Sequence, residues 1–253
     1  MVDEILEKWM KLFNMRSFCN EIPGQILFHV LIGQKLKDFQ IPLRPGVTKD
    51  CRIHFSHLQD SGSGKGAGLE FFEEMTREFG YNPIHLSAST TDSSLLDLNQ
   101  KVKKDTYMQV PGILSACTFA IYPEARVLFE PGKWNSEIRE IILSVMEPIG
   151  TEGHKYKKSL GSWNNEAIDT TSSASIIFTT RPIVNLREDI IRIGHLQRTI
   201  FYPRELSKSI RKEMNIKNSE ALLCEVDFET EKKEIVKDII ERCNITELPQ
   251  ILV

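Results

Sequence analysis

The sequence predicts an α/β fold in which a mainly parallel sheet lies between two layers of helices. Three observations predict this fold. Short apolar runs typical of buried strands alternate along the chain with segments whose apolar residues have helical spacing. A glycine-rich turn, residues 61–68, joins an early strand to a helix. No internal repeat or heptad pattern points to another architecture.

Composition places the chain among ordinary globular proteins. It has 253 residues, of which 41% are hydrophobic and 26% charged, which excludes wholesale disorder. The longest apolar runs, such as 26–32, are too short to cross a bilayer, and the acidic N-terminus lacks a secretory pattern. Five widely spaced cysteines without a C-x-x-C pair indicate reduced thiols. We therefore expect a cytoplasmic protein, or a virus-encoded intracellular one, that does not bind membranes.

The N-terminal region predicts two helices, 3–16 and 24–37, separated by a break at Asn20 and Pro23. A proline-containing linker, residues 42–46, follows them. We expect these two helices to form an N-terminal helical cap over residues 1–48.

The middle of the chain carries the predicted core, residues 49–204. Alternating and continuous apolar runs predict strands, and 3.6-residue periodicity predicts helices. The predicted strands are 51–58, 84–86, 114–122, 175–179 and 197–202. The predicted helices are 69–79, 95–103, 136–146 and 186–193, with a polar, turn-rich stretch at 149–170. Two further helices, 204–214 and 230–243, form the expected C-terminal segment, residues 205–253.

Charge is distributed unevenly along the chain. The net charge is −3, so no overall field attracts nucleic acid. Residues 181–212 carry +5, and residues 218–253 carry −5. The basic segment is either a solvated face or a functional one, and charge alone does not decide between them.

The glycine-rich turn has the composition of a phosphate-binding loop. Such a loop needs small residues whose amides turn inward, a lysine that reaches the terminal phosphates, and a helix N-terminus behind it. Ser61-Gly62-Ser63-Gly64-Lys65 supplies these between a predicted strand and a predicted helix. Gln59 stands where the first glycine of the G-x-x-x-x-G-K motif is expected, and Gly66 where a serine or threonine is expected.

This loop resembles the Walker A loop of P-loop ATPases. The resemblance implies a three-layer P-loop NTPase sandwich that binds ATP and Mg²⁺ and hydrolyses ATP. It also implies that the phosphates contact the residues of the loop and the first helical turn. These residues are Ser61, Gly62, Ser63, Gly64, Lys65, Gly66 and Ala67.

Residues 118–126 resemble a Walker B strand, with Pro123 in place of its aspartate. Glu124 then matches the catalytic glutamate that polarises the attacking water. Glu130, after a shorter apolar run, is the second candidate.

Residues 175–182 are similar to a sensor-1 strand, in which Thr179 or Thr180 would contact the γ-phosphate or the water. Residues 194–201 resemble the segment of ring-forming helicases that presents an arginine finger to the neighbouring subunit, with Arg198 the first choice and Arg192 the second. An arginine supplied in trans implies a homo-oligomeric ring.

Residues 150–163 occupy the position of a pore hairpin in hexameric DNA translocases of the superfamily 3 and AAA+ kinds. Lysines neutralise phosphates and aromatic rings stack on bases, which suits sequence-independent binding of single-stranded DNA. The basic candidates are Lys155, Lys157 and Lys158, and the aromatic ones are Tyr156 and Trp163.

The position of the metal is unknown from sequence, because Gly66 and Pro123 both remove expected Mg²⁺ contacts. Asp60, Asp92 and Glu130 are possible substitutes that the sequence does not place. Three functions stay open: a ring-forming DNA helicase or helicase-like replication ATPase, an ATP-dependent helicase loader or assembly switch, and a small-molecule kinase. Weak metal contacts suit slow hydrolysis.

Overall fold

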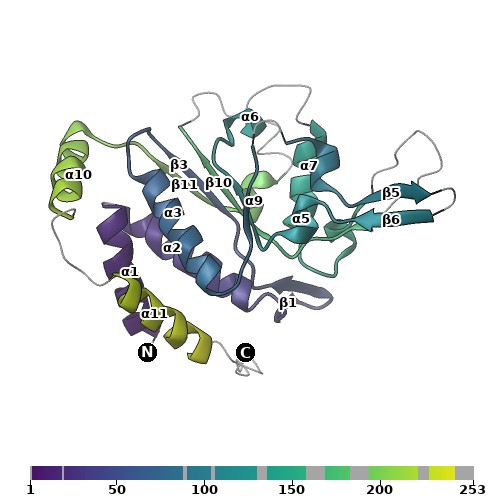
Figure 1. Cartoon of the computed structure of the whole chain (residues 1–253), viewed down its shortest axis with the longest axis horizontal. Coiled ribbons are helices and arrows are strands. Elements are labelled where there is room, and N and C mark those ends of the chain that lie inside the picture. Colours follow the sequence, from purple (N-terminus) through teal and green to yellow (C-terminus); the bar gives the residue numbers. More distant parts are fainter. Residues whose placement is uncertain are drawn as a thin grey trace.

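The centre of the protein is a five-stranded sheet, seen in the computed structural model of the chain (Figure 1). The structure describes residues 2–18, 20–87, 90–103, 106–129, 136–157, 169–182, 194–221 and 228–242. The strand order is β11-β3-β10-β7-β4, and every neighbouring pair is parallel. The strands are β3 (Phe55–Gln59), β4 (Pro83–His85), β7 (Phe119–Tyr122), β10 (Ser175–Thr180) and β11 (Ile200–Arg204).

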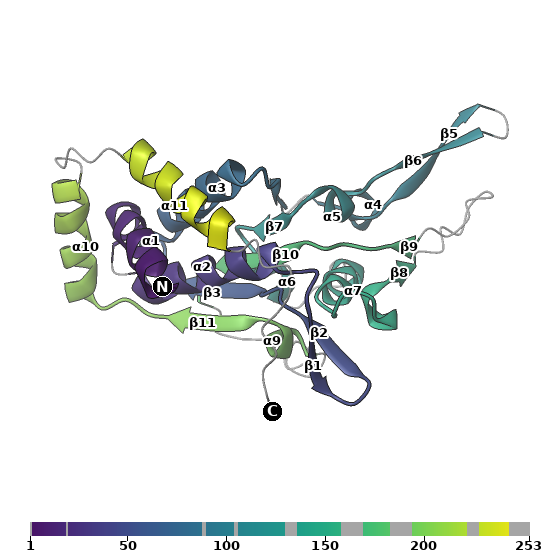
Figure 2. The same cartoon turned by 90° about the horizontal axis from the view of Figure 1, so that it is seen from below.

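One face of the sheet is covered by four helices, which Figure 2 shows on the same side. They are α1 (Val2–Arg16), α2 (Glu21–Lys35), α3 (Lys65–Glu78) and α11 (Phe228–Arg242). Side chains on this face, including Phe55, Ile121 and Ile177, share one hydrophobic cluster with Trp9 of α1 and Phe71 of α3. Of the N-terminal helices, α2 packs on β3, and α1 packs on α2, α3 and α11.

The opposite face buries the alternate residues of the same strands. Ala120, Tyr122, Ile176 and Phe178 lie in a second cluster, because successive side chains of a strand point to opposite faces. Its helices are α4 (Asp92–Leu95), α5 (Ile113–Ala116), α6 (Arg126–Phe129) and α7 (Ser136–Val145). Helices thus lie on both faces of a parallel sheet, which confirms the predicted α/β class.

Two predictions near the start of the core were wrong in detail. The expected linker 42–46 belongs to an antiparallel hairpin of β1 (Gln40–Arg44) and β2 (Val47–Asp50). Gly46 adopts a φ of 76° at its turn, a value that suits glycine. The first strand of the sheet begins at Phe55 instead of Cys51.

The predicted helix 95–103 was also wrong. Residues in this range form the end of α4 and then β5 (Leu98–Lys103), which pairs antiparallel with β6 (Thr106–Val110). Leu95 and Leu96 are buried in the second cluster, so their apolar signal comes from a single short helical turn. The expected strand 114–122 divides similarly into α5 and β7.

The C-terminal half follows the predictions more closely. Helices 136–146 and 230–243 are confirmed as α7 and α11, and α10 spans Lys208–Ala221. The expected strand 197–202 is preceded by a short helix, α9 (His195–Arg198). The polar stretch contains the turn η2 (Glu152–His154) and the pair β8 (Tyr156–Lys157) and β9 (Asp169–Thr170). The predicted helix 186–193 lies outside the described residues.

The long axis of the molecule runs from α10 at one end to the β5–β6 hairpin at the other (Figures 1 and 2). The glycine-rich loop lies at the carboxyl edge of the sheet, because it follows β3. Among the described residues, no helix combines the length and apolar character needed to cross a membrane.

Candidate functional site

The carboxyl edge of the sheet brings together three residues that are far apart in the sequence. Lys65 follows β3, Glu124 follows β7, and Thr180 ends β10. Because β10 lies between β3 and β7 and all three run parallel, their last residues meet at one edge. The structure therefore gathers the predicted phosphate, water and sensor positions around the loop.

Lys65 links the ends of two strands. Its Nζ donates to the carbonyl of Gln59 at 2.8 Å and to that of Thr180 at 3.1 Å. An ammonium group has three donors, so one remains for another acceptor. Burial lowers the pKa of Lys65, the carboxylate of Glu124 opposes this shift, and the positive charge of Arg181 adds to it. Lys65 therefore lies within electrostatic reach of both side chains.

The glycine-rich loop directs its carbonyl groups toward the protein. Gly62 and Gly64 both have a φ of 71°, the left-handed conformation that glycine adopts without strain. Asn20 Nδ2 donates to the carbonyl of Ser63 at 2.8 Å, and Ser17 Oγ donates to that of Gly64 at 2.8 Å. Ser63 Oγ donates to the carbonyl of Asp60 at 2.6 Å.

The amides of the loop are left without protein acceptors. Within the described ranges, the backbone N–H groups of Gly62 and of residues 64–66 donate to no protein atom. They belong to the loop and to the first turn of α3, where the helix dipole favours negative charge. Successive free amides around left-handed residues form a concave anion-binding site. The arrangement fits a phosphate group.

Gln59 stands where the G-x-x-x-x-G-K motif has its first glycine, and its side chain lies beneath the loop and bonds to it. Its side chain is fully buried. Its Nε2 donates to Asn20 Oδ1 at 2.8 Å and to the Ser63 carbonyl at 3.3 Å. Its Oε1 contacts His57 Nε2. Where the motif has its first glycine, this chain therefore has a glutamine whose side-chain contacts fix the loop.

Sequence reasoning missed the contribution of the turn between α1 and α2. Asn20 was recognised only as a helix break, and Ser17 was not singled out. Both side chains are about 1% exposed. The available signal was two polar residues beside a predicted break. Their burial, which requires hydrogen-bond partners, is known only from the structure.

Around Lys65, the ends of β7 and β10 are tied together. Thr179 Oγ1 donates to the Pro123 carbonyl at 2.9 Å, and the Ala125 amide donates to the Thr179 carbonyl at 3.1 Å. The Thr180 hydroxyl is buried and has no hydrogen-bond partner within the described part of the chain. Glu124 is exposed and, among the same residues, has no ion-pair partner. Thr179 is thus engaged in the fold, whereas Thr180 and Glu124 keep unused polar groups.

Two arginines near the loop were not predicted as site residues. Arg211 of α10 forms an ion pair with Asp60 at the start of the loop. Arg181 directly follows Thr180 and is exposed. It forms no ion pair or hydrogen bond with any residue that the structure describes. Arg181 lay at the end of the sensor-1-like segment 175–182 and at the start of the basic segment 181–212, but the sequence analysis gave it no role of its own.

Arg198 lies at the other edge of the sheet. It ends α9, just before the first residue of β11, and its guanidinium pairs with Glu147. The structure does not bring it to the loop of its own chain, and a contact with a second subunit stays a prediction. Arg192 and Glu130, the second choices, lie outside the described residues.

Of the predicted nucleic-acid lysines, Lys155 and Lys157 lie toward this same amino edge. The β8–β9 pair forms the base of a hairpin, and Lys155 precedes it with a side chain 44% exposed and 4.0 Å from Glu152. Tyr156 packs partly against the second hydrophobic cluster. Lys157 lies on β8, but its side chain is not among those described, and Lys158 and Trp163 fall outside the described ranges.

Protein ligands for Mg²⁺ are scarce at the loop. Gly66 has no side chain, Pro123 offers no donor atom, and the carboxylate of Asp60 is paired with Arg211. Asp92 begins α4. The described residues contain no cluster of three or more His, Cys, Asp or Glu side chains that could hold a metal ion. Among the described residues, side-chain ligands for Mg²⁺ at the loop are therefore few, and the candidate Glu130 lies outside them.

No protein-family model matches the sequence, and no curated protein matches it either. The assignment of this site rests on its geometry and chemistry.

Proposed function

We propose that this chain binds ATP, with the terminal phosphates seated on the amides of the glycine-rich loop. The observation that carries the proposal is the loop itself: its carbonyls are engaged by Ser17, Asn20 and Ser63, while its amides have no acceptor among the described residues. This polarity suits an anion. Lys65 supplies the positive charge at the terminal phosphate.

Hydrolysis of ATP would use Glu124 to orient the attacking water and Thr180 to contact the γ-phosphate or that water. The carboxylate of Glu124 has no ion-pair partner and the hydroxyl of Thr180 no hydrogen-bond partner among the residues that the structure describes, and both absences support these roles. Because the protein offers few ligands for Mg²⁺, we expect slow turnover. The broader function that we propose is that of a helicase-like ATPase acting on single-stranded DNA in a homo-oligomeric ring.

The second candidate is an ATP-dependent helicase loader or assembly switch. The scarcity of metal ligands favours it, since a switch needs binding more than fast hydrolysis. A strand-unwinding assay separates the two: a helicase unwinds a forked DNA duplex alone, whereas a loader binds ATP and unwinds nothing. Light scattering with a non-hydrolysable ATP analogue and single-stranded DNA tests for the ring, and a monomer under all conditions contradicts it.

The phosphate site itself is tested by Lys65→Ala. We expect this variant to lose ATP binding in a calorimetric titration, because the ammonium group that faces the terminal phosphates is gone. Lys233→Ala, at an exposed position on α11, is the control and should bind ATP normally. Circular dichroism verifies that both variants fold. Unchanged ATP affinity in folded Lys65→Ala would exclude this site.

A further inference from the structure

Not every positively charged side chain near the glycine-rich loop pairs with another residue in the described part of the chain. Lys65 Nζ bonds the carbonyl of Thr180 at 3.1 Å, and the residue after Thr180 is Arg181. Arg181 therefore directly follows the strand end that Lys65 contacts, and its positive charge acts on the ammonium group of Lys65. Its guanidinium is exposed and forms no ion pair with any described residue.

The glycine-rich loop itself offers little free negative charge to a metal ion. Asp60 is neutralised by Arg211, and Gly66 and Pro123 provide no ligand for a metal. A Cβ atom placed on Gly66 would meet no atom within 4 Å, so no neighbouring group excludes the usual hydroxyl-bearing residue. Position 66 thus has space for a metal-binding side chain and carries none.

A terminal phosphate needs compensating charge when it leaves water. An arginine guanidinium supplies it with two parallel N–H donors that match phosphate oxygens. We propose that Arg181, together with Lys65, offsets the charge of the terminal phosphate in place of a metal ion held by the protein. The chain then binds nucleoside triphosphates with little dependence on Mg²⁺. This inference rests on the proposed ATP site.

The test is a calorimetric titration of the full chain with ATP and with a non-hydrolysable analogue, in Mg²⁺ and in EDTA. We expect the wild-type Kd to differ by less than about 3-fold between the two buffers. Arg181→Gln should weaken binding by about 10-fold or more in both buffers, the effect of losing a charged hydrogen-bonded pair. Arg181→Lys keeps the charge and should recover part of the loss. Lys233→Gln removes one exposed positive charge elsewhere and should bind like wild type.

Two results overturn the inference and leave the ATP site intact. One is a wild-type affinity that falls 10-fold or more in EDTA and is abolished by Lys65→Ala. The other is an Arg181→Gln variant that binds as tightly as wild type. If the wild-type chain binds no triphosphate in either buffer, the proposed function fails, and the inference fails with it.

Discussion

His57 and Gln59 point to the same face of β3, two residues apart, and meet beneath the loop. His57 is 4% exposed and stacks on Phe55, with ring centroids 5.5 Å apart. Burial lowers the pKa of His57 to about 4, although its contact with Gln59 opposes the shift. The imidazole is therefore neutral in the folded protein at pH 7.

The neutral state of His57 predicts a loss of stability in acid. Between pH 6.5 and 4 the unfolded chain binds a proton that the folded chain does not, so the free energy of unfolding should fall by up to about 3 kcal/mol as the pH drops through this range. His57→Gln should remove the share of this dependence that His57 causes, in urea denaturation measured at several pH values. His154, whose pKa is also lowered by burial, adds a share of the same sign that His57→Gln leaves in place.

The exposed His29 on α2 provides a matched control for His57. His29→Gln should retain the wild-type dependence of stability on pH between 4 and 6.5. An equal slope in wild type and His57→Gln would show that other groups cause the acid loss.

The residues of the site come from two places: the ends of the sheet strands, and the turn between α1 and α2. Lys65, Glu124 and Thr180 were named from the resemblance of their segments to Walker A, Walker B and sensor-1 motifs. The structure brings them to one edge because the ends of parallel strands converge. Ser17 and Asn20 reach the loop through the packing of α1 and α2 on the sheet. That packing depends on tertiary contacts, which a linear motif does not encode. Arg181 is significant only because it has no described partner.

At the scale of elements, α3 is bound closely to α1. A Cβ atom on Gly68 would lie 2.9 Å from Phe13 Cζ and 3.0 Å from Ser17 Oγ. The Phe13 ring is also pressed against Gly24, where a Cβ would come within 2.6 Å of it. The ring therefore has little room to move away, and a glycine at position 68 allows the two helices to approach.

We predict opposite effects for alanine at two glycines in the first turn of α3. Gly68→Ala should destabilise the protein by about 1–3 kcal/mol, because the added methyl group overpacks the contact with Phe13. Gly66→Ala meets no atom within 4 Å and should be neutral or stabilising by up to about 1 kcal/mol, from helix propensity. Thermal unfolding of both variants measures the difference. Equal stability of the two variants would contradict the packing argument.

Elements that bury a continuous apolar stripe were predictable, as α1, α7 and α11 show. The hairpins were not. The strands of β1–β2 and β5–β6 pair with each other instead of joining the central sheet. Residues 40–43 of β1 are exposed, so no buried face imposes an alternating pattern on this strand. Leu95 and Leu96 are buried at the end of α4. They gave the predicted helix 95–103 its apolar signal, although most of that range forms β5.

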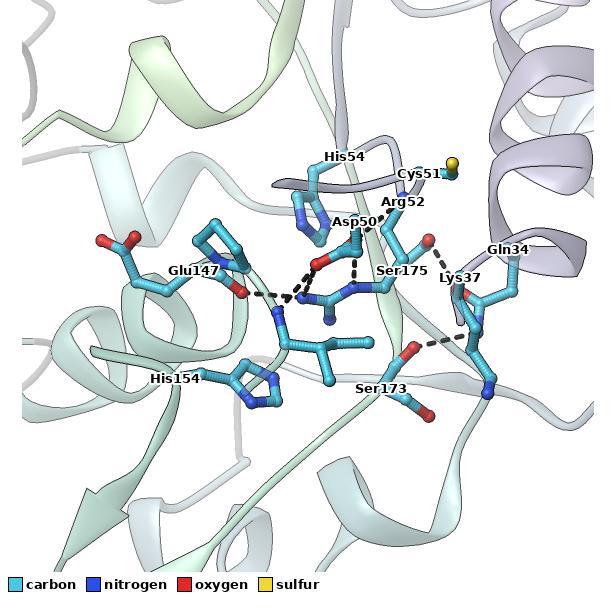
Figure 3. A network of polar contacts seen from close by, with 12 residues as sticks. Gln34, Lys37, Asp50, Cys51, Arg52, His54, Glu147, His154, Ser173 and Ser175 are labelled. Atoms are coloured by element: carbon cyan, nitrogen blue, oxygen red, sulfur yellow. Dashed lines mark hydrogen bonds and ion pairs between the residues drawn. The ribbon is translucent and has the colours of Figure 1, made fainter. Parts of the chain in front are cut away.

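At the scale of the whole molecule, a buried arginine joins the amino edge of the sheet to its surroundings. Figure 3 shows Arg52 between Asp50 and Glu147. The Arg52 and Asp50 side chains are 0% and 4% exposed, and their ion pair is 2.9 Å long. Burial favours the neutral form of Asp50, but the hydrogen bond and charge of Arg52 outweigh it and lower its pKa. The guanidinium also donates to the carbonyls of Val145, Glu147, Ser172 and Ala174.

Removal of Arg52 should therefore loosen several segments at once. We expect Arg52→Leu to lower the free energy of unfolding by about 3–5 kcal/mol, because Asp50 is left as a buried unpaired charge and four carbonyls lose a donor. Chemical denaturation measures the loss. Lys237→Gln breaks an exposed ion pair on α11 and should change stability by less than about 0.5 kcal/mol. A loss below about 1 kcal/mol for Arg52→Leu would show that the surrounding segments hold together without it.

The hydrogen bonds from Ser17 and Asn20 to the loop have a mechanical consequence. They couple the turn between α1 and α2 to the glycine-rich loop without passing through the sheet. A displacement of these two helices reaches the carbonyls of Ser63 and Gly64 through one hydrogen bond each. Whatever binds the N-terminal helices can therefore alter the conformation of the loop.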